Sequence, residues 1–563
     1  MIRLLVIAYI LSACAASPVS AAPRLDILGP SDAELYKKIF DVQDRSDFKT
    51  ADKLIRRVNN KLLMGHVQFQ RYMHPTGYKS KFGELRTWLK KYNDHPEAYR
   101  AFSLAMKRKP KKAVQPKRPV YGEEHILALV GEAPARPMRF VGEQERIARD
   151  VRKRIRKGDN AGAVKLLRSA NSRRVLSKVK QDTLAARIAM GYFVDGADET
   201  AYRIAAAAGK RSGEAVSQAH WVAALSAYRS GWIDLAVRHF EANALAEGAT
   251  SWTSAAGAFW AGRIHLALGD MGSANRWLGA ATRHPRTFYG QLALHALTVA
   301  SPFKWEGLVA GKAEVGRLRR LKAGKRALAL LQIGERWRGD QELQPLVDDA
   351  KGTMLRAILA VSISYRAPRA AVQSAHRLQQ IGGEFVPAGL YPIAPWKTKR
   401  SYRVDQALLL AFMRQESQFN PHASSPAGAR GLMQVLPSTA NYVVGEKRYV
   451  NAGRDGLFDP DQSVEIGGRY IRYLLNKKAV GNGLFRLAIA YNAGIGNLIR
   501  WRREVQHNDD PLLFIEAIPS RETRVFVERV MANYWLYQDQ LNQNLTTRDD
   551  VAQGRWPIYN PQD

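Results

Sequence analysis

The chain has 563 residues, of which 46% are apolar and 24% are charged. This is a soluble globular composition, and the length excludes a single hydrophobic core of ordinary size, so we expect two or more domains. Lysine and arginine number 86 against 51 acidic residues, a net charge of +35, which predicts an anionic partner such as nucleic acid, acidic lipid or bacterial wall polymer.

Residues 1–22 predict a signal peptide. Arg3 is followed by an apolar run over 4–13, which is too short to span a bilayer as a mature helix. An exported protein meets little nucleic acid, so we expect none as a partner and place the protein in the periplasm. The only cysteine, Cys14, ends a stretch similar to a bacterial lipobox, whereas the small residues at 19–21 suit cleavage that would discard it. A soluble protein and one attached to the membrane through Cys14 both stay open.

Residues 23–381 predict an α-superhelical domain. Long segments rich in alanine, leucine, arginine and lysine are broken at glycine or proline. Four segments share a glycine, a polar start and an alanine that faces a bulky residue one turn later, and these alanines follow one another at intervals of 38, 35 and 38 residues: Ala163, Ala201, Ala236 and Ala274. Such a period is typical of stacked helix hairpins. An irregular helical domain is the alternative, and both interpretations are all-α.

Two stretches have the composition of connectors. Residues 107–119 carry seven basic residues, no acidic ones and three prolines, which predicts a solvated, extended segment. Binding of an anionic polymer by this segment is the alternative interpretation. Residues 382–399 concentrate glycine and proline and predict a linker at the main domain boundary. We expect a catalytic domain over 400–545 and a C-terminal tail over 546–563.

Glu416 is placed where an amphipathic helix would carry an apolar residue. At about 100° per residue, Leu409, Phe412 and Met413 lie within roughly 60° of it, so its carboxylate should point inward. Pro421 disfavours a helical Asn420, so we expect the helix to end there with Glu416 in its last turn. Burial and the carbonyl end of the helix both favour the neutral acid.

Further motifs follow in chain order. The glycines of "SSPAGARGLMQ" predict a sharp turn that brings Ser425 and Gln434 back toward Glu416. "LAIAYNAGIGNLIRW" predicts a helix broken at Gly494, with Tyr491 and Asn492 at the polar end, and "IPSRETRVFVERV" places Glu522 at the start of a final helix. The aspartates of "FDPDQSV" are assigned to starting a helix.

These residues in this order resemble the soluble lytic transglycosylases, which cleave bacterial peptidoglycan. The matching pieces are "ES" at 416–417, "GLMQ" at 431–434, "AYNAG" at 490–494 and "ETR" at 522–524, within roughly 400–545. The resemblance implies a lysozyme-like, mainly helical catalytic domain after the superhelix. "TFYGQLALHAL" at 287–297 is similar to the superhelix of the longer, ring-forming type.

The resemblance also implies roles for individual residues. Glu416 matches the single general acid and base, and four further positions match residues that line the sugar cleft or lie near the acid: Ser425, Gln434, Tyr491 and Glu522. Asn492 belongs to the same motif and is expected to bind substrate. The chain departs from the family at Leu436 and Phe526, where methionine and tyrosine are frequent.

The implied reaction is the cleavage of the bond between N-acetylmuramic acid and N-acetylglucosamine, with a 1,6-anhydro end. Glu416 would protonate the leaving oxygen and then accept the proton of the sugar's own 6-hydroxyl. A hydrolytic muramidase would share Glu416 but would need a second carboxylate to activate water. A non-catalytic scaffold that binds wall polymer is the remaining alternative. The scattered histidines give no metal-ligand spacing, so we expect no metal and no cofactor.

Overall fold

The computed structural model describes residues 22–74, 76–122, 138–398 and 402–562. In these ranges every regular element is a helix, and only three isolated β-bridges occur. The protein is therefore all-α, as the sequence predicts. Residues 1–21 of the predicted signal peptide, Cys14 included, lie outside the described residues. No helix within the described ranges is long and apolar enough to cross a membrane.

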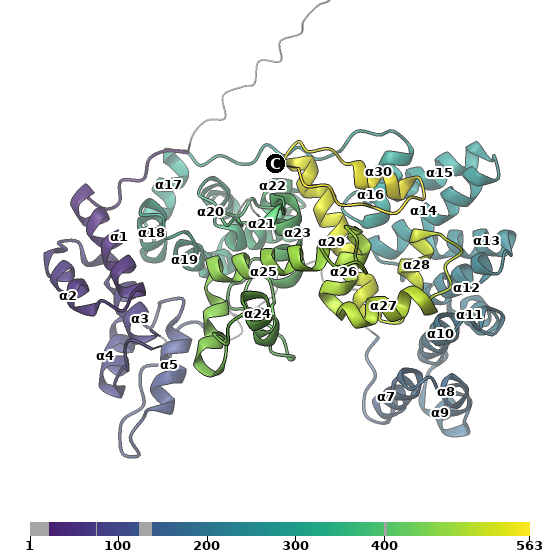
Figure 1. The fold of residues 1–563 in the computed structure, drawn as a ribbon, viewed down its shortest axis with the longest axis horizontal. Coiled ribbons are helices and arrows are strands. Elements are labelled where there is room, and N and C mark those ends of the chain that lie inside the picture. The colour runs from purple at the N-terminus through teal and green to yellow at the C-terminus, as the bar shows by residue number, and fades with distance from the viewer. Residues whose placement is uncertain (1–21, 75, 123–137, 399–401, 563) are drawn as a thin grey trace, which may run out of the picture.

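Figure 1 shows three groups of superhelical helices around a central group. The first group lies at one end of the molecule and consists of α1 (Pro30–Asp44), α2 (Phe48–Arg57), η1 (Lys61–Leu63), α3 (Met64–Tyr72), α4 (Phe82–Tyr92) and α5 (Ala98–Lys107). The second group lies at the opposite end and consists of α7 (Glu143–Arg156), α8 (Asn160–Leu167), α9 (Ala170–Val175), α10 (Lys178–Val194), α11 (Asp198–Ser212), α12 (Ser217–Arg229), α13 (Ile233–Leu245), α14 (Ser251–Ala267), α15 (Met271–Thr282) and α16 (Phe288–Ala296).

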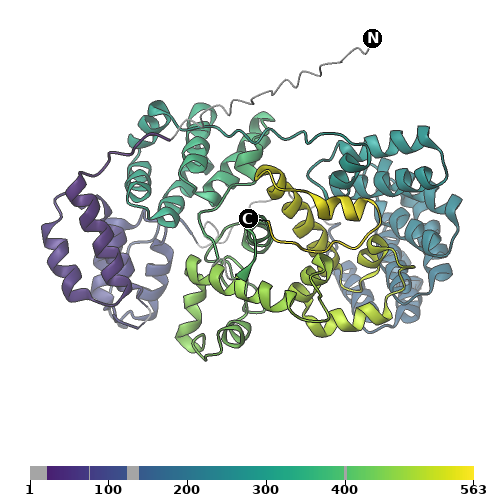
Figure 2. The same ribbon diagram turned by 45° about the horizontal axis from the view of Figure 1, so that its top comes forward.

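The third group returns to the first, as the turned view in Figure 2 also shows. It consists of α17 (Lys312–Arg319), α18 (Lys322–Gln332), α19 (Arg336–Asp349), α20 (Gly352–Ser364), α21 (Pro368–Gly382) and α22 (Pro387–Leu390). The central group consists of α23 (Gln406–Ser417), α24 (Pro437–Val444), η3 (Asn451–Phe458), α25 (Pro460–Leu475), α26 (Leu484–Ala493), α27 (Ile495–Glu504), α28 (Pro511–Ala517) and α29 (Arg521–Gln540), and the last helix is α30 (Thr546–Ala552).

The second group is built from helix hairpins, and the four repeat alanines explain why. Each is at most 1% exposed and lies in the first turn of the second helix of its hairpin: Ala163, Ala201, Ala236 and Ala274. The glycine before each of these helices has a positive φ of 75 to 80°, a conformation that costs little only for glycine: Gly158, Gly196, Gly231 and Gly269. The repeat predicted from the sequence therefore marks the turn of each hairpin.

The stretches predicted as connectors differ in their packing. Most side chains of residues 107–119 are exposed, although the backbone carbonyl of Arg118 accepts a hydrogen bond from Asn93 at 3.2 Å. The region predicted as a linker instead contains α22 and buried side chains, including Leu390 and Tyr391. Arg414 on α23 donates to the Leu390 carbonyl, so this stretch is packed onto the central group.

The central group contacts superhelical helices on two sides. On one side, Phe288 of α16 stacks on Trp535 of α29 with ring centroids 5.2 Å apart, and Arg263 of α14 lies 2.7 Å from Asp510. On the other side, Trp337 of α19 contacts the ring of His422, six residues after Glu416. The superhelix therefore holds the central group from both ends.

Candidate active site

Glu416 is positioned by α23. Asp405 caps the start of this helix, because its carboxylate accepts a hydrogen bond from the backbone N–H of Leu408 at 2.8 Å. The apolar residues that share the face of Glu416 are fully or almost fully buried, as the periodicity predicts: Leu409, Phe412 and Met413. The helix ends at Ser417 rather than at Asn420, because Gln418 and Phe419 adopt left-handed φ values of 49° and 61°. Glu416 thus lies in the last helical turn.

The surroundings of Glu416 favour its neutral form. Burial, followed by the negative charge of Glu522, raises the pKa of Glu416 to about 8. No cation among the described residues offsets these two effects. The carboxyl group is therefore an acid that keeps its proton at neutral pH and can still release it.

The chain after α23 folds back in a tight loop. Gly431 has a φ of 77°, and a Cβ there would lie 1.9 Å from the Leu457 carbonyl oxygen, so only glycine fits. Ser425 Oγ accepts a hydrogen bond from the backbone N–H of Ala429 at 3.1 Å. Residues 431–434 make a turn, and the next helix, α24, begins at Pro437.

The side chain of Gln434 holds this loop together through two hydrogen bonds to its backbone. Its side-chain Nε2 donates to the backbone carbonyls of Ala423 and Gly431, each at 2.9 Å. Both amide hydrogens are therefore used by the protein, and the amide oxygen is the polar atom left to face a ligand.

Tyr491 and Asn492 connect α26 to the same region. The Tyr491 hydroxyl donates to the Met433 carbonyl at 2.7 Å, and its ring lies 4.6 Å from the ring of Phe412 on α23. Burial raises the pKa of this hydroxyl, and the nearby charge of Glu416 raises it further. Asn492 Oδ1 accepts a hydrogen bond from Thr523 Oγ1 of α29 at 2.7 Å. The structure thus brings α23, the loop, α26 and α29 together around Glu416.

Glu522 and Arg524 begin α29 but have different surroundings. Glu522 is exposed, and its charge acts on Glu416. Arg524 is buried and donates to the Ile518 carbonyl, and among the described residues it forms no ion pair with Glu522. Phe526, at the position where the family often has tyrosine, stacks on Tyr491 at 6.4 Å.

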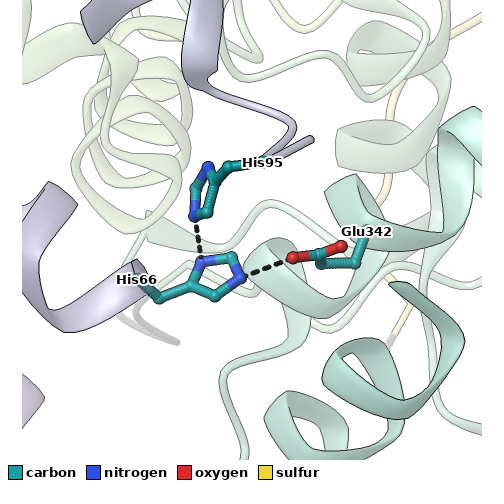
Figure 3. Close-up of side chains that lie close together, drawn as sticks. All are labelled: His66, His95 and Glu342. Atoms are coloured by element: carbon teal, nitrogen blue, oxygen red, sulfur yellow. Dashed lines mark hydrogen bonds and ion pairs between the residues drawn. The ribbon is translucent and has the colours of Figure 1, made fainter. Parts of the chain in front are cut away.

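A second cluster of titratable groups lies away from Glu416, where α3 and the turn before α5 meet α19 (Figure 3). His66 Nε2 lies 2.7 Å from Glu342 Oε1, and His66 Nδ1 lies 2.9 Å from His95 Nε2. All three side chains are buried, and their ligand-type atoms lie within 4.8 Å of one another. No sequence pattern predicts this cluster, because its members are far apart in the chain.

Hydrogen bonding within the protein accounts for this cluster. A metal ion needs ligand atoms that point at one centre, whereas His66 uses its two nitrogens toward two different partners. Arg326 of α18 also donates to both oxygens of Glu342, at 2.6 and 2.8 Å, and so neutralises the charge that a cation would need. Burial holds the pKa values of both histidines well below their usual range.

The same network reaches the loop after Glu416. Glu97, only 2% exposed, lies 2.8 Å from Arg100 on α5 and 2.9 Å from His422 in that loop. Burial opposes ionisation of Glu97, but the charges of His422 and Arg100 hold its pKa well below the usual range. An ionised carboxylate of the first helical group thus anchors the loop that carries Ser425 and Gln434.

The fold and the site define a helical protein in which a superhelix surrounds a smaller lysozyme-like domain that carries the half-buried acid Glu416. Residues 394–514 match the family model described as "Transglycosylase SLT domain".

Named relatives agree with this assignment. Soluble lytic murein transglycosylase of Escherichia coli (strain K12) is 34% identical over 155 residues, which cover 27% of this chain and 23% of that protein. Membrane-bound lytic murein transglycosylase C of Sodalis glossinidius is 37% identical over 170 residues, 29% of this chain and 42% of that protein. The match thus spans about a quarter of the length of the first of these relatives.

The fold is shared more widely than the sequence. The structure of an inactive mutant of lytic transglycosylase Slt from Pseudomonas aeruginosa aligns with a TM-score of 0.53 and 19% identity, covering 94% of this chain and 89% of that one. The superhelix with a lysozyme-like domain is therefore confirmed as the fold of the whole described chain.

Proposed function

We propose that this protein is a lytic transglycosylase that cleaves peptidoglycan between N-acetylmuramic acid and N-acetylglucosamine and leaves a 1,6-anhydro end. The observation that carries the proposal is Glu416, a half-buried acid with no cationic partner among the described residues and a pKa raised to about 8. The names of the related proteins and the SLT domain support the choice of substrate.

Glu416 performs both proton transfers in this proposal. As the neutral acid, it donates its proton to the glycosidic oxygen, so the bond to the anomeric carbon breaks and the leaving sugar keeps the proton. The resulting carboxylate then accepts the proton of the 6-hydroxyl while that oxygen bonds to the anomeric carbon. No water is consumed, and Glu416 ends in its starting form.

The other site residues act by position. Gln434 and Ser425 hold the loop beside Glu416, and the free amide oxygen of Gln434 accepts a hydrogen bond from a sugar hydroxyl. Tyr491 and Asn492 connect α26 to the loop and to α29, and Asn492 also faces the glycan strand of the substrate. Glu522 has two roles in this proposal. It contacts the sugar, and its negative charge helps to keep Glu416 protonated.

A hydrolase of the same fold would need a second carboxylate to activate water. Two of the aspartates that follow Glu416 in the chain are engaged elsewhere: Asp455 lies 3.1 Å from Arg430, and Asp459 caps α25 by accepting from the Gln462 N–H at 2.9 Å. Glu522, whose charge acts on Glu416, is the carboxylate that a muramidase would have to use.

Product analysis separates the candidate functions. Digestion of purified cell wall should release fragments one water lighter than hydrolysis products, and borohydride should not reduce them because the anhydro end has no free hemiacetal. Full-mass, reducible fragments would establish a muramidase instead. If no fragments are released, the protein is a wall-binding scaffold without catalytic activity.

We further propose that the protein acts in the periplasm after export by the segment 1–22. Its relatives carry both "soluble" and "membrane-bound" in their names, so both forms occur among similar proteins. Mass spectrometry of the mature N-terminus will show either an acylated Cys14 or a start beyond it.

A further inference from the structure

A strongly basic surface lies in the first helical group, at one end of the molecule (Figure 1). Residues 76–122 contain thirteen basic residues and three acidic ones. Ten of the basic side chains are exposed, and we call them the basic surface: Lys79, Lys81, Arg86, Lys90, Lys91, Lys107, Lys111, Lys112, Lys117 and Arg118. Nothing in the proposed reaction at Glu416 uses them.

The structure holds the loop after α5 against the segments that flank α4. Near the start of this loop, Arg108 donates to the carbonyl and the hydroxyl of Ser80, which precedes α4. Near its end, the Val120 N–H donates to the Asn93 carbonyl at 2.9 Å, and the Asn93 side chain donates to the Arg118 carbonyl at 3.2 Å. Because the loop is fastened beside α4 at both ends, its lysines and those of α4 belong to one surface.

The acidic residues of this segment do not neutralise the basic surface. Asp94 pairs with two cations of α18, at 2.9 and 3.1 Å, and Glu97 forms the buried pairs described above. The carboxylate of Glu84 accepts a hydrogen bond from the Lys81 backbone N–H at 2.6 Å, at the start of α4. In the part of the chain that the structure describes, none of the ten side chains has an ion-pair partner. Their charges are therefore left for an outside partner.

The kind of cation on this surface indicates the kind of partner. Eight of the ten residues are lysines, and only Arg86 and Arg118 are arginines. A lysine ammonium is a compact point charge on a flexible stem, whereas the planar guanidinium group of arginine binds one anion through two parallel hydrogen bonds. A set of flexible point charges suits a partner that presents many anions side by side.

Exposed aliphatic side chains lie among these lysines. Val114 is 73% exposed and Val120 is 59% exposed, and Met106, next to Lys107, is 39% exposed. On a membrane, such side chains enter the boundary between head groups and acyl chains while the basic groups stay with the anionic head groups. A wall polymer offers anions but no apolar layer, so the exposed aliphatic residues favour a lipid surface.

We propose that the basic surface docks the protein onto an anionic phospholipid membrane. The lysines lie at the lipid phosphate groups, and Val114 enters the boundary with the acyl chains. Binding of this kind is reversible, because basic residues with few apolar side chains hold a protein less firmly than a membrane-spanning helix. The docking goes beyond the proposed function, since it needs no bond cleavage, and it places the active site beside the membrane.

Sedimentation with vesicles tests the docking. The protein starting at Ala22 contains every described residue and no acyl group, and the vesicles hold equal parts of phosphatidylglycerol and phosphatidylcholine. The loop variant combines Lys107→Gln, Lys111→Gln, Lys112→Gln and Lys117→Gln. Since each basic residue near an anionic lipid surface strengthens binding by about fivefold, the loop variant should bind at least about 100-fold more weakly. Wild-type binding should weaken with salt and be absent on phosphatidylcholine alone.

A control with the same change in charge separates this surface from the net charge of +35. It combines four substitutions at exposed positions of the second helical group, at the opposite end of the molecule in Figure 1: Lys165→Gln, Lys178→Gln, Lys210→Gln and Arg238→Gln. Exposed charges are screened beyond about 10 Å, so the control should bind the same vesicles within about threefold of the wild type. Equal losses in the control and the loop variant would overturn the proposal.

An uncharged substitution distinguishes a membrane from a wall polymer. Val114→Ser keeps every charge but loses the partial burial of a valine, so binding to the vesicles should weaken by about threefold to tenfold. Sedimentation of this variant with purified wall should match the wild type. Unchanged binding to vesicles would overturn the contact of Val114 with the acyl boundary.

Activity measurements keep the docking separate from the proposed function. The loop variant should bind and lyse purified wall as the wild type does, because its residues lie outside the site at Glu416. If it loses binding to wall while binding to vesicles stays, the surface binds wall polymer and the membrane assignment is wrong. If the vesicles are bound as described but no wall is cleaved by the wild type, the docking stands and the proposed function is wrong.

Discussion

Glu416 and Glu97 are two enclosed glutamates with opposite acidity. Burial and the charge of Glu522 raise the pKa of Glu416 to about 8. Glu97 is also buried, but Arg100 and His422 hold its pKa well below the usual range. The difference between the two regions therefore lies in partners rather than in burial.

This contrast suits the two regions to different tasks. An ionised, paired Glu97 can fix the loop at His422 but cannot donate a proton at neutral pH. Enclosing the unpaired Glu416 costs free energy, but this residue can donate a proton at neutral pH. Only six residues separate Glu416 from His422, so the charged anchor holds the segment that begins where the acid ends.

The largest effect is expected from Glu416→Gln. The amide keeps the shape of the side chain but has no transferable proton, so wall lysis should fall by about 100- to 10,000-fold. Glu446→Gln is the matched control, because Glu446 is exposed and lies 3.8 Å from Arg448. Turbidity assays on purified wall, with circular dichroism to verify folding, measure the loss. Wild-type rates in a folded Glu416→Gln protein would remove Glu416 from the reaction.

Glu97→Gln should act on stability. Removing one charge leaves Arg100 and His422 around an uncharged amide, and breaking a buried pair in this way costs about 3 kcal/mol of unfolding free energy. Urea unfolding followed by tryptophan fluorescence gives the value. Glu34→Gln is the control, since the exposed pair of Glu34 and Lys37, at 3.3 Å, is worth under about 1 kcal/mol. Equal stabilities for the two variants would contradict the anchoring role.

Glu522→Gln should shift the pH profile of lysis. The negative charge of Glu522 raises the pKa of Glu416, so its removal lowers that pKa, and the protonated acid is then lost at a lower pH. Relative to pH 6, activity at pH 9 should fall further than in the wild type, by less than about tenfold because Glu522 is exposed to solvent. A pH profile of kcat at fixed ionic strength checks this. An alkaline limb that stays in place would mean that burial alone sets the acidity of Glu416.

The sequence alone predicted the parts of the molecule that depend on local patterns. The inward face of Glu416 follows from the spacing of Leu409, Phe412 and Met413, and each hairpin turn follows from a glycine before a small alanine. The contact of His422 with Glu97 could not be predicted, because it joins residues 325 positions apart that no periodicity relates. The domain boundaries and the roles of the individual site residues stay predictions.

Predictions from neighbouring residues were less accurate where the backbone could adopt more than one conformation. Pro421 indicated a helix end near Asn420, but Gln418 and Phe419 end α23 earlier by adopting left-handed conformations. Left-handed φ values are uncommon at residues other than glycine, so a sequence pattern does not predict them. The composition of the predicted linker also does not show whether it is covered: its Leu390 and Tyr391 are buried, because tertiary packing decides which segments are covered.

Tyr491→Phe should have the smallest effect and tests whether a polar contact supports the surroundings of Glu416. The hydroxyl donates to the Met433 carbonyl at 2.7 Å, so its removal should cost about 1 kcal/mol of unfolding free energy. Tyr442→Phe is the matched control: Tyr442 is 65% exposed and its hydroxyl lies 3.1 Å from that of Tyr473, so water replaces the lost contact. Because the Tyr491 hydroxyl is directed to Met433, kcat should fall by less than about tenfold, well short of a lost general acid. Urea unfolding and lysis rates on the same preparations give both numbers. A kcat loss as large as that of Glu416→Gln would show that the hydroxyl leaves Met433 and takes part in proton transfer, and Glu416 would then not be the isolated acid that its contrast with Glu97 implies.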